Sequence, residues 1–246
     1  MSWLKFMKIK NVMLWSLVAL LVASCGTNDK NTMVVNGTIK GLKKGTLYLQ
    51  QIQDTILKNL DSLEINGNGD FSLSAAVTDP DIFYLYLTKE DNNAINDRIT
   101  FFGEPGIITI KTTWNSFEAE AKISGPGSTS NEKYEEYRKG MSRYNAKDLE
   151  LLQAQFNPKF SNDSLAIDSL LKLSDKNVYR SYAYGLNFAL NNKDSYVAPY
   201  IAVNEVAESN VKYLDSIYKM LTPEVADSKY GKKLKLHIEE VKKAKN

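Results

Sequence analysis

Histidine and cysteine, the side chains that most often act as bases and nucleophiles, occur only once each in this 246-residue chain. A histidine-activated serine or cysteine nucleophile therefore has one candidate base, His237. His237 lies between Leu234, Ile238 and Val241 on the apolar side of an expected helix, which favours a partly buried, hydrogen-bonded histidine over a catalytic one. No recognisable set of metal ligands accompanies it, so we expect neither a metal nor another cofactor.

Carboxylates are plentiful, and two of them across a cleft could perform acid–base hydrolysis. The sequence does not single out such a pair. Glu118 and Glu120 alternate as on a solvent-facing strand, and Glu135 and Glu136 lie opposite the tyrosines of their helix. A carboxylate-dependent hydrolase is therefore one hypothesis, although these patterns favour a protein that is not an enzyme.

Cys25, the only cysteine, follows a segment with the features of an export signal. Three lysines precede an apolar run over residues 12–22 that is interrupted only by Ser16, and the small residues Ala23 and Ser24 close it. The run is shorter than the roughly 20 residues that a membrane span requires. Residues 21–25 (Leu-Val-Ala-Ser-Cys) resemble the bacterial lipobox.

The lipobox resemblance implies cleavage between Ser24 and Cys25, diacylation of the Cys25 thiol, and transfer of a third chain, such as palmitate, to the new amino group. Residues 1–24 are then a lipoprotein signal peptide and residues 25–31 a lipidated tether. One acyl chain binds a bilayer only weakly, at about 0.8 kcal/mol per buried methylene, whereas several chains make attachment effectively permanent. The alternatives are an ordinary secretory signal followed by an incidental cysteine, or a buried apolar cysteine.

The lipobox resemblance also predicts a location in the cell envelope, at the outer membrane and facing the periplasm. Asp29 is the only acidic residue soon after the anchor, so the acidic cluster that resembles a surface-export signal is missing. Removing residues 1–24 removes three lysines, which changes the formal charge from +2 to −1. A nearly neutral mature chain lacks the excess of positive charge that is typical of nucleic-acid-binding proteins. The expected partners are the membrane, through the acyl chains, and an envelope protein or glycan.

Alternating apolar residues and frequent turns predict a β domain over residues 32–127. Eight or so short strands suggest an antiparallel sandwich or open barrel, and Gly103-Glu104-Pro105-Gly106 is expected to turn the chain. The segment from Phe117 to Ile123 alternates and is expected to be the last strand. The expected strands before it are 33–40, 46–52, 60–65, 71–73, 82–87, 98–102 and 107–111.

After Gly127 the apolar period becomes helical, which predicts an α-helical domain over residues 128–246 and an α+β protein as a whole. Thr129-x-x-Glu132 resembles a capping box. Pro158, Pro199 and Pro223 mark helix breaks or first turns. The expected apolar stripes are Tyr134, Tyr137, Met141 and Tyr144; Val178, Tyr182, Leu186 and Ala189; Val211, Leu214, Tyr218 and Leu221; and Tyr230, Leu234, Ile238 and Val241. Tyrosines 179, 182, 184, 196 and 200 could line a carbohydrate or peptide groove, but helical spacing favours core packing.

Several short motifs, taken in order, are similar to those of a known family. Their order and spacing resemble the N-terminal β domain of unknown function, with its helical insert, of envelope thiol–disulfide interchange lipoproteins. The β-domain motifs are 37–41 (GTIKG), 45–49 (GTLYL), 61–62 (DS), 69–73 (GDFSL), Pro80 with 83–85 (FYL), 101–106 (FFGEPG), and 123–125 (ISG) before Asn131 and Tyr134. The insert motifs are 195–200 (SYVAPY), 221–223 (LTP) and 228–232 (SKYGK).

In that family a thioredoxin-like module of the alkyl hydroperoxide reductase and thiol-specific antioxidant type usually follows this domain. The present sequence ends at Asn246, and the Trp-Cys-x-x-Cys motif of the module is absent. We therefore expect that the redox activity is not carried over. The first hypothesis is a non-catalytic, lipid-anchored envelope protein that binds a partner. The second is an accessory component of periplasmic thiol–disulfide exchange that acts with a separate thioredoxin-like protein.

Aspartate followed by serine or threonine and then by leucine or isoleucine occurs five times, and this pattern resembles the acceptor motif for O-glycosylation of exported proteins in some Gram-negative bacteria. A glycan would add bulk and solubility at the surface. The same residues are also favoured helix caps, which is a purely structural explanation. The candidate acceptors are Thr55, Ser62, Ser164, Ser169 and Ser216.

Overall fold

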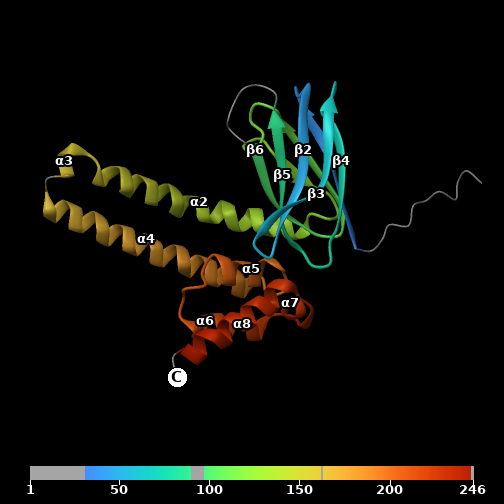
Figure 1. The fold of residues 1–246 in the computed structure, drawn as a ribbon. Coiled ribbons are helices and arrows are strands. Elements are labelled where there is room, and N and C mark those ends of the chain that lie inside the picture. Colours follow the sequence, from blue (N-terminus) through green and yellow to red (C-terminus); the bar gives the residue numbers. More distant parts are fainter. Residues whose placement is uncertain (1–30, 90–96, 162, 245–246) are drawn as a thin grey trace, which may run out of the picture. The chain divides into compact units, whose positions relative to one another are not determined.

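A computed structural model describes residues 31–89, 97–161 and 163–244 (Figure 1). From Asn31 onward these residues form one compact unit. Eight strands in two sheets are followed, within the described residues, by seven helices. The expectation of an α+β protein with an N-terminal β-sandwich and a C-terminal helical region is confirmed, and the sheets do not close into a barrel.

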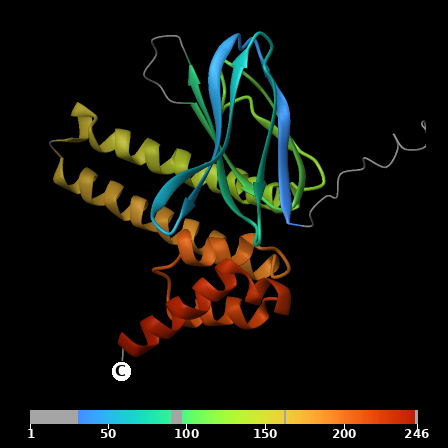
Figure 2. The ribbon, with the colours of Figure 1, turned by 45° about the vertical axis from the view of Figure 1, so that its right-hand side comes forward.

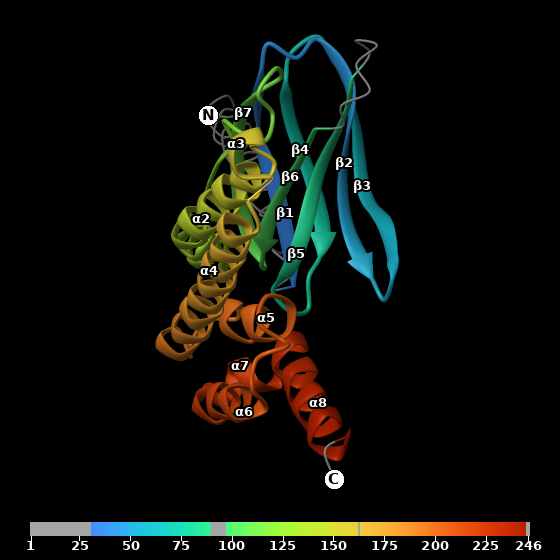
Figure 3. The same cartoon turned by 90° about the vertical axis from the view of Figure 1, so that its left-hand side faces the viewer.

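The two four-stranded sheets of the sandwich face each other (Figure 3). One has the strand order β4-β1-β7-β8 and the other β3-β2-β5-β6. The pairing is antiparallel except between β1 and β7, which are parallel, so the purely antiparallel expectation was wrong at this pair. The strands are β1 Thr32–Lys40, β2 Lys44–Gln53, β3 Ile56–Asn66, β4 Asp70–Ala76, β5 Asp81–Lys89, β6 Asp97–Gly103, β7 Gly106–Thr113 and β8 Lys122–Ser124.

Alternate residues of the strands fill the space between the sheets. Val35 and Ile110 come from one sheet, Leu47, Leu85 and Phe101 come from the other, and all five are fully buried. Successive side chains of a strand point to opposite faces, so this alternation in the sequence places one apolar set inside the sandwich. The strand predictions followed from the same alternation.

The segment from Phe117 to Ile123 is a strand only at its end, so this prediction was largely wrong. The backbone N–H of Glu120 donates to the carbonyl of Ser116 at 3.0 Å, and that of Ala121 donates to the carbonyl of Glu118 at 3.2 Å. These short-range hydrogen bonds turn the chain. Phe117 is buried, and its carbonyl accepts from the Thr112 hydroxyl at 2.7 Å. The apolar alternation therefore reflected one buried side chain in an otherwise exposed turn rather than an extended strand.

The helical region begins with a long antiparallel hairpin of α2 and α4 (Figures 1 and 2). These helices have 27 and 28 residues, which corresponds to about 40 Å each at 1.5 Å per residue. Four shorter helices, α5 to α8, follow the hairpin. None of the helices among the described residues has both the length and the apolar character that crossing a bilayer requires. The helices are α2 Thr129–Gln155, α3 Pro158–Ser161, α4 Ser164–Asn191, α5 Val197–Asn204, α6 Val211–Met220, α7 Pro223–Asp227 and α8 Lys229–Ala244.

The start of α2 is capped from the sandwich, and the capping box expected at Thr129 and Glu132 is not formed. Glu104, in the turn between β6 and β7, accepts the backbone N–H groups of Thr129 at 2.8 Å and Ser130 at 3.3 Å. Its second oxygen accepts the Ser130 hydroxyl at 2.6 Å. A carboxylate is favourable at this helix end because the first N–H groups are unpaired and the helix dipole is positive there.

A second core joins the sandwich to the helices. Phe102 projects from β6 onto the rings of Tyr134, Tyr200 and Tyr230, with centroid separations of 6.1, 5.6 and 6.2 Å. The backbone N–H of Phe102 donates to the buried side chain of Asn131 at 3.1 Å, which satisfies the outer edge of β6. The predicted helical stripes contribute a further part of this core, and α5, on which no stripe was predicted, contributes Val197, Ala198, Ile201 and Ala202.

Candidate functional site

The predicted lipidation and cleavage residues, Cys25 and Ser24, lie outside the described residues. The signal peptide, the anchor and the tether therefore stay predictions. The described chain starts within seven residues of Cys25, and each extended residue spans at most about 3.6 Å. If Cys25 is acylated, the start of β1 therefore lies within about 25 Å of the membrane surface.

The five candidate O-glycosylation residues are all exposed. The aspartates that precede several of them also have structural partners. Asp163 caps α4 by accepting the N–H groups of Leu165 and Ala166 at 3.0 and 3.1 Å. Asp215 forms ion pairs with Lys219 at 2.6 Å and Lys242 at 2.7 Å. Glycosylation stays a prediction, and the acceptors concerned are Thr55, Ser62, Ser164, Ser169 and Ser216.

His237 is partly buried, and its Nε2 lies 3.0 Å from the carbonyl oxygen of Ala207. This agrees with the expected structural histidine. Within the described ranges, no group of three histidine, cysteine, aspartate or glutamate side chains is arranged to hold a metal ion.

A buried carboxylate, Asp81, connects the start of β5 to the start of α8. Its two oxygens accept hydrogen bonds from Gln51 Nε2 at 2.9 Å, the backbone N–H of Ile82 at 2.8 Å, the Lys229 ammonium and the Tyr230 hydroxyl. Burial and, next, the charge of Asp81 raise the pKa of Tyr230 above its usual range. Because both carboxylate oxygens of Asp81 accept hydrogen bonds from groups of the same chain, we interpret it as a structural junction rather than a reaction centre.

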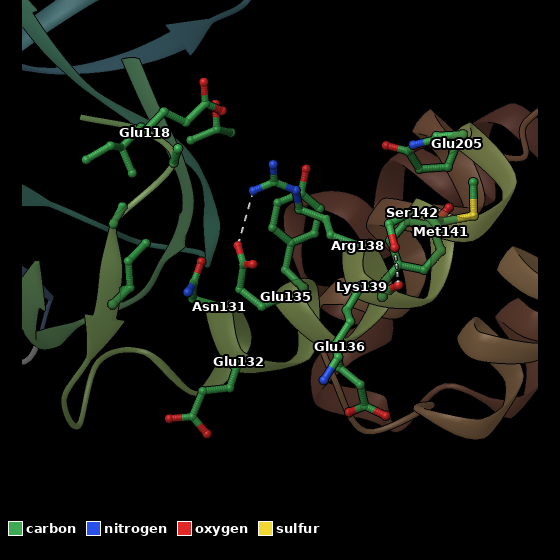
Figure 4. Close-up of a pocket in the computed structure, with 18 of the residues that line it drawn as sticks. Glu118, Asn131, Glu132, Glu135, Glu136, Arg138, Lys139, Met141, Ser142 and Glu205 are labelled. Atoms are coloured by element: carbon green, nitrogen blue, oxygen red, sulfur yellow. Dashed lines mark hydrogen bonds and ion pairs between the residues drawn. The ribbon is translucent and has the colours of Figure 1, made fainter. Parts of the chain in front are cut away.

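An acidic cleft of about 1290 Å³ lies along α2, against β6 and the turn before β8. Five glutamates and two basic residues are among its lining side chains. In the view of Figure 4, Glu118 and Glu205 lie at opposite ends, with the Glu135–Arg138 ion pair between them. The charged lining residues are Glu118, Glu132, Glu135, Glu136, Glu205, Arg138 and Lys139.

Ion pairs occupy two of the five glutamates of the acidic cleft. Glu135 is 3.2 Å from Arg138, and Glu136 is 2.9 Å from Lys133. Partial burial raises the pKa of Glu205 above its usual range, although part of this residue stays exposed. A carboxyl group with a raised pKa is suited to donating a proton. Among the described residues, the lining glutamates without an ion pair are Glu118, Glu132 and Glu205, and these are the carboxylates available for the pair that sequence reasoning left open.

A second, more apolar groove of about 780 Å³ lies between α4 and the segment that leads into α6; we call it the α4–α6 groove. Its floor is the stripe Val178, Tyr182 and Leu186, which sequence reasoning had assigned to the core. Val178 is 44% exposed, because the neighbouring helices cover only part of the stripe. The lining residues are Asp175, Val178, Tyr179, Tyr182, Ala183, Leu186, Asn187, Leu190, Glu208, Ser209, Asn210 and Tyr213.

The five tyrosines that the sequence analysis named as a possible carbohydrate or peptide groove lie in two different environments. Tyr179 and Tyr182 line the α4–α6 groove. Tyr184 and Tyr200 pack in the helical core, and the Tyr196 hydroxyl donates to Glu224 at 2.6 Å. Sequence reasoning missed Glu208, Ser209 and Tyr213 on the opposite wall, because nothing in the local sequence shows that this segment returns to α4.

One comparison with known proteins found a match, and the matched residues span the sandwich. Residues 33–134 match the family model described as a domain of unknown function (DUF4369). The match begins in β1 and ends in the first turns of α2, so it includes the Asn131 and Glu104 contacts described above. No curated protein and no solved structure matched the chain. The resemblance to a domain of unknown function is thus supported for these residues, and its link to thiol–disulfide lipoproteins stays a prediction.

Proposed function

We propose that this protein is a non-catalytic, lipid-anchored component of the bacterial cell envelope, attached through Cys25 to the outer membrane, that binds a partner on the periplasmic side. The observation that carries the binding role is the α4–α6 groove, whose aromatic and aliphatic lining is left uncovered by the described chain. Contiguous exposed apolar surface of this kind is typical of interaction sites. The anchor is supported by the sequence around Cys25 alone.

The anchor is tested by expressing the full chain in a Gram-negative bacterium with labelled palmitate. The wild-type protein should incorporate the label and fractionate with the outer membrane. Cys25→Ala should remain uncleaved and unlabelled, while Asp29→Asn, a change four residues further on, should behave as the wild type. An unmodified Cys25 thiol on a wild-type protein that still fractionates with membranes would refute the anchor.

The binding role is tested in the same cells with a photo-crosslinking amino acid at Tyr179 in the groove. Tyr179 is 77% exposed, and Ile56, which is 61% exposed on the β-sandwich, is a matched control position. We expect a discrete adduct from position 179 and none from position 56. The absence of an adduct from position 179, or equal adducts from both positions, would contradict a binding role for this groove.

A carboxylate-dependent hydrolase is the second candidate, and the raised pKa of Glu205 in the acidic cleft is the observation that favours it. The test is turnover of ester, glycoside and peptide substrates by the purified chain. Any activity found should be abolished by Glu205→Gln or Glu118→Gln but not by Glu150→Gln, which lies on α2 outside the cleft. No turnover in any substrate class would remove this candidate.

A further inference from the structure

The α4–α6 groove has the length and the surface pattern of a helix-binding site. Its residues on α4 extend from Asp175 to Leu190, which is about 22 Å along the helix axis, or four turns. Val178, Tyr182, Leu186 and Leu190 follow each other at steps of four residues and form one ridge. Helices pack by placing such ridges into the grooves of a neighbour, so this floor is complementary to another helix.

An extended peptide segment would form fewer backbone hydrogen bonds in this groove than it forms at the edge of a sheet. The interior N–H and C=O groups of α4 are already paired within the helix, so the floor offers no free strand edge for backbone hydrogen bonding. Recognition must therefore use side chains. Tyr179 on α4 and Tyr213 at the start of α6 are 77% and 56% exposed, and aromatic rings of this kind often dominate binding energy.

The charge and polarity of the groove define the partner further. The charged side chains that line it, among the residues that the structure describes, are Asp175 on α4 and Glu208 on the opposite wall. Neither forms an ion pair with another described residue. An incoming segment can therefore supply cations to both walls.

We propose that the α4–α6 groove binds one amphipathic helix of a partner protein, with an apolar stripe flanked on both sides by lysine or arginine. This inference rests on the proposed partner-binding function and names the class of partner. The apolar stripe packs on Val178, Tyr182 and Leu186, and the flanking cations face Asp175 and Glu208. Charge complementarity of this kind sets specificity and association rate more than total affinity.

The experiment uses residues 26–246, which contain the whole compact unit, and two fluorescent 18-residue peptides. Both peptides carry leucines at positions spaced for one helix face; one has lysines and the other glutamates on the flanks. The wild-type protein should bind the lysine peptide at least tenfold more tightly in fluorescence anisotropy. The double variant Asp175→Lys with Glu208→Lys should reverse this preference, and Asp168→Lys, on α4 outside the groove, should leave it unchanged.

Both exchanged acids are exposed, so the double variant is expected to fold, and circular dichroism checks this. Several results would overturn the proposal. These are no binding of the lysine peptide, equal binding of both peptides, or a preference that survives the charge reversal. A dimer in sedimentation that Tyr179→Asp disperses would show that a second copy fills the groove. Displacement of the peptide by a fluorescent fatty acid at equal concentration would identify a lipid site instead.

Failure of this experiment is distinguishable from failure of the proposed function. The peptides are tested on a fragment without the signal peptide and Cys25, so an unacylated Cys25 would not affect the result. Conversely, acylation of Cys25 together with a crosslinked adduct at position 179 would support the proposed function even if the partner is not a basic helix.

Discussion

The hydrogen bond from Tyr230 to Asp81 should contribute measurably to stability, and Tyr230→Phe tests this. The substitution keeps the ring, which packs against Phe102 and Tyr200 at centroid separations of 6.2 and 5.0 Å, and removes only the hydroxyl. Asp81 is 4% exposed, so the lost donor cannot easily be replaced by bulk water. A hydrogen bond to a charged group contributes about 1.5–3 kcal/mol net. We therefore expect the free energy of unfolding to fall by about 2 kcal/mol.

The matched control for Tyr230→Phe is Tyr137→Phe, in the same helical core. Tyr137 is also nearly fully buried, but its hydroxyl has no hydrogen-bond partner among the described residues. Removing an unpaired buried hydroxyl should leave the free energy of unfolding unchanged or raise it by about 1 kcal/mol. The two substitutions therefore make the same chemical change and should have effects of opposite sign or clearly different size.

The assay is urea unfolding followed by circular dichroism, supported by thermal melts. A loss of about 2 kcal/mol corresponds to a fall in Tm of roughly 4–8 °C for a domain of this size. The slope of free energy against urea should be the same in all three proteins, since a change in slope would report an altered unfolded state. Equal destabilisation by Tyr230→Phe and Tyr137→Phe would refute the argument, because it would trace the effect to the ring environment rather than to Asp81.

Three further predictions concern other ionisable groups. Burial raises the pKa of Glu205, so the carboxylate form is disfavoured in the folded state and stability is lost as pH rises through that pKa. At pH 7, Glu205→Gln should therefore unfold at a higher urea concentration than the wild type. Below about pH 4, where both side chains are neutral, the two proteins should unfold at the same urea concentration. Burial and the hydrogen bond to Glu224 raise the pKa of Tyr196 to about 12, so its contribution to stability should persist below pH 10 and disappear as pH rises through about 12. Glu224→Gln should move the phenolate absorbance of Tyr196 to lower pH. Glu104→Ala should lower the free energy of unfolding by about 1–2 kcal/mol through loss of the α2 cap, whereas Glu132→Ala should lower it by less than about 0.5 kcal/mol. A larger effect of Glu132→Ala would instead show that the local capping box stabilises α2.

Local patterns predicted the parts of the fold that local physics decides. Alternation identified the strands because one face of each sheet is buried, and helical spacing identified stripes such as Leu214 on α6 and Leu234 on α8. Alternation failed at Phe117, where apolar residues enter the core from a turn rather than from a strand. A burial pattern by itself does not distinguish these two backbones.

Contacts between distant residues escaped prediction for a different reason. The cap of α2 comes from Glu104, 25 residues upstream, while the local Thr129-x-x-Glu132 pattern is unused. Asp81 meets Tyr230 across 149 residues. Neither acid stands out in the sequence, because an aspartate or glutamate at a turn is ordinary. Only the folded chain shows that each one satisfies several donors at the boundary between strands and helices.

The same comparison explains why we place the binding site on the helical side. Where the sandwich meets the starts of α2 and α8, Asp81 and Glu104 together accept seven hydrogen bonds, so these two carboxylates are satisfied within the chain. The α4–α6 groove has the opposite character, with exposed aromatic rings and two acids that form no ion pair with any other described residue. Buried polar groups in proteins are normally satisfied and large apolar patches are normally covered. One incoming helix with basic flanks would cover the exposed rings of the groove and place cations opposite both acids.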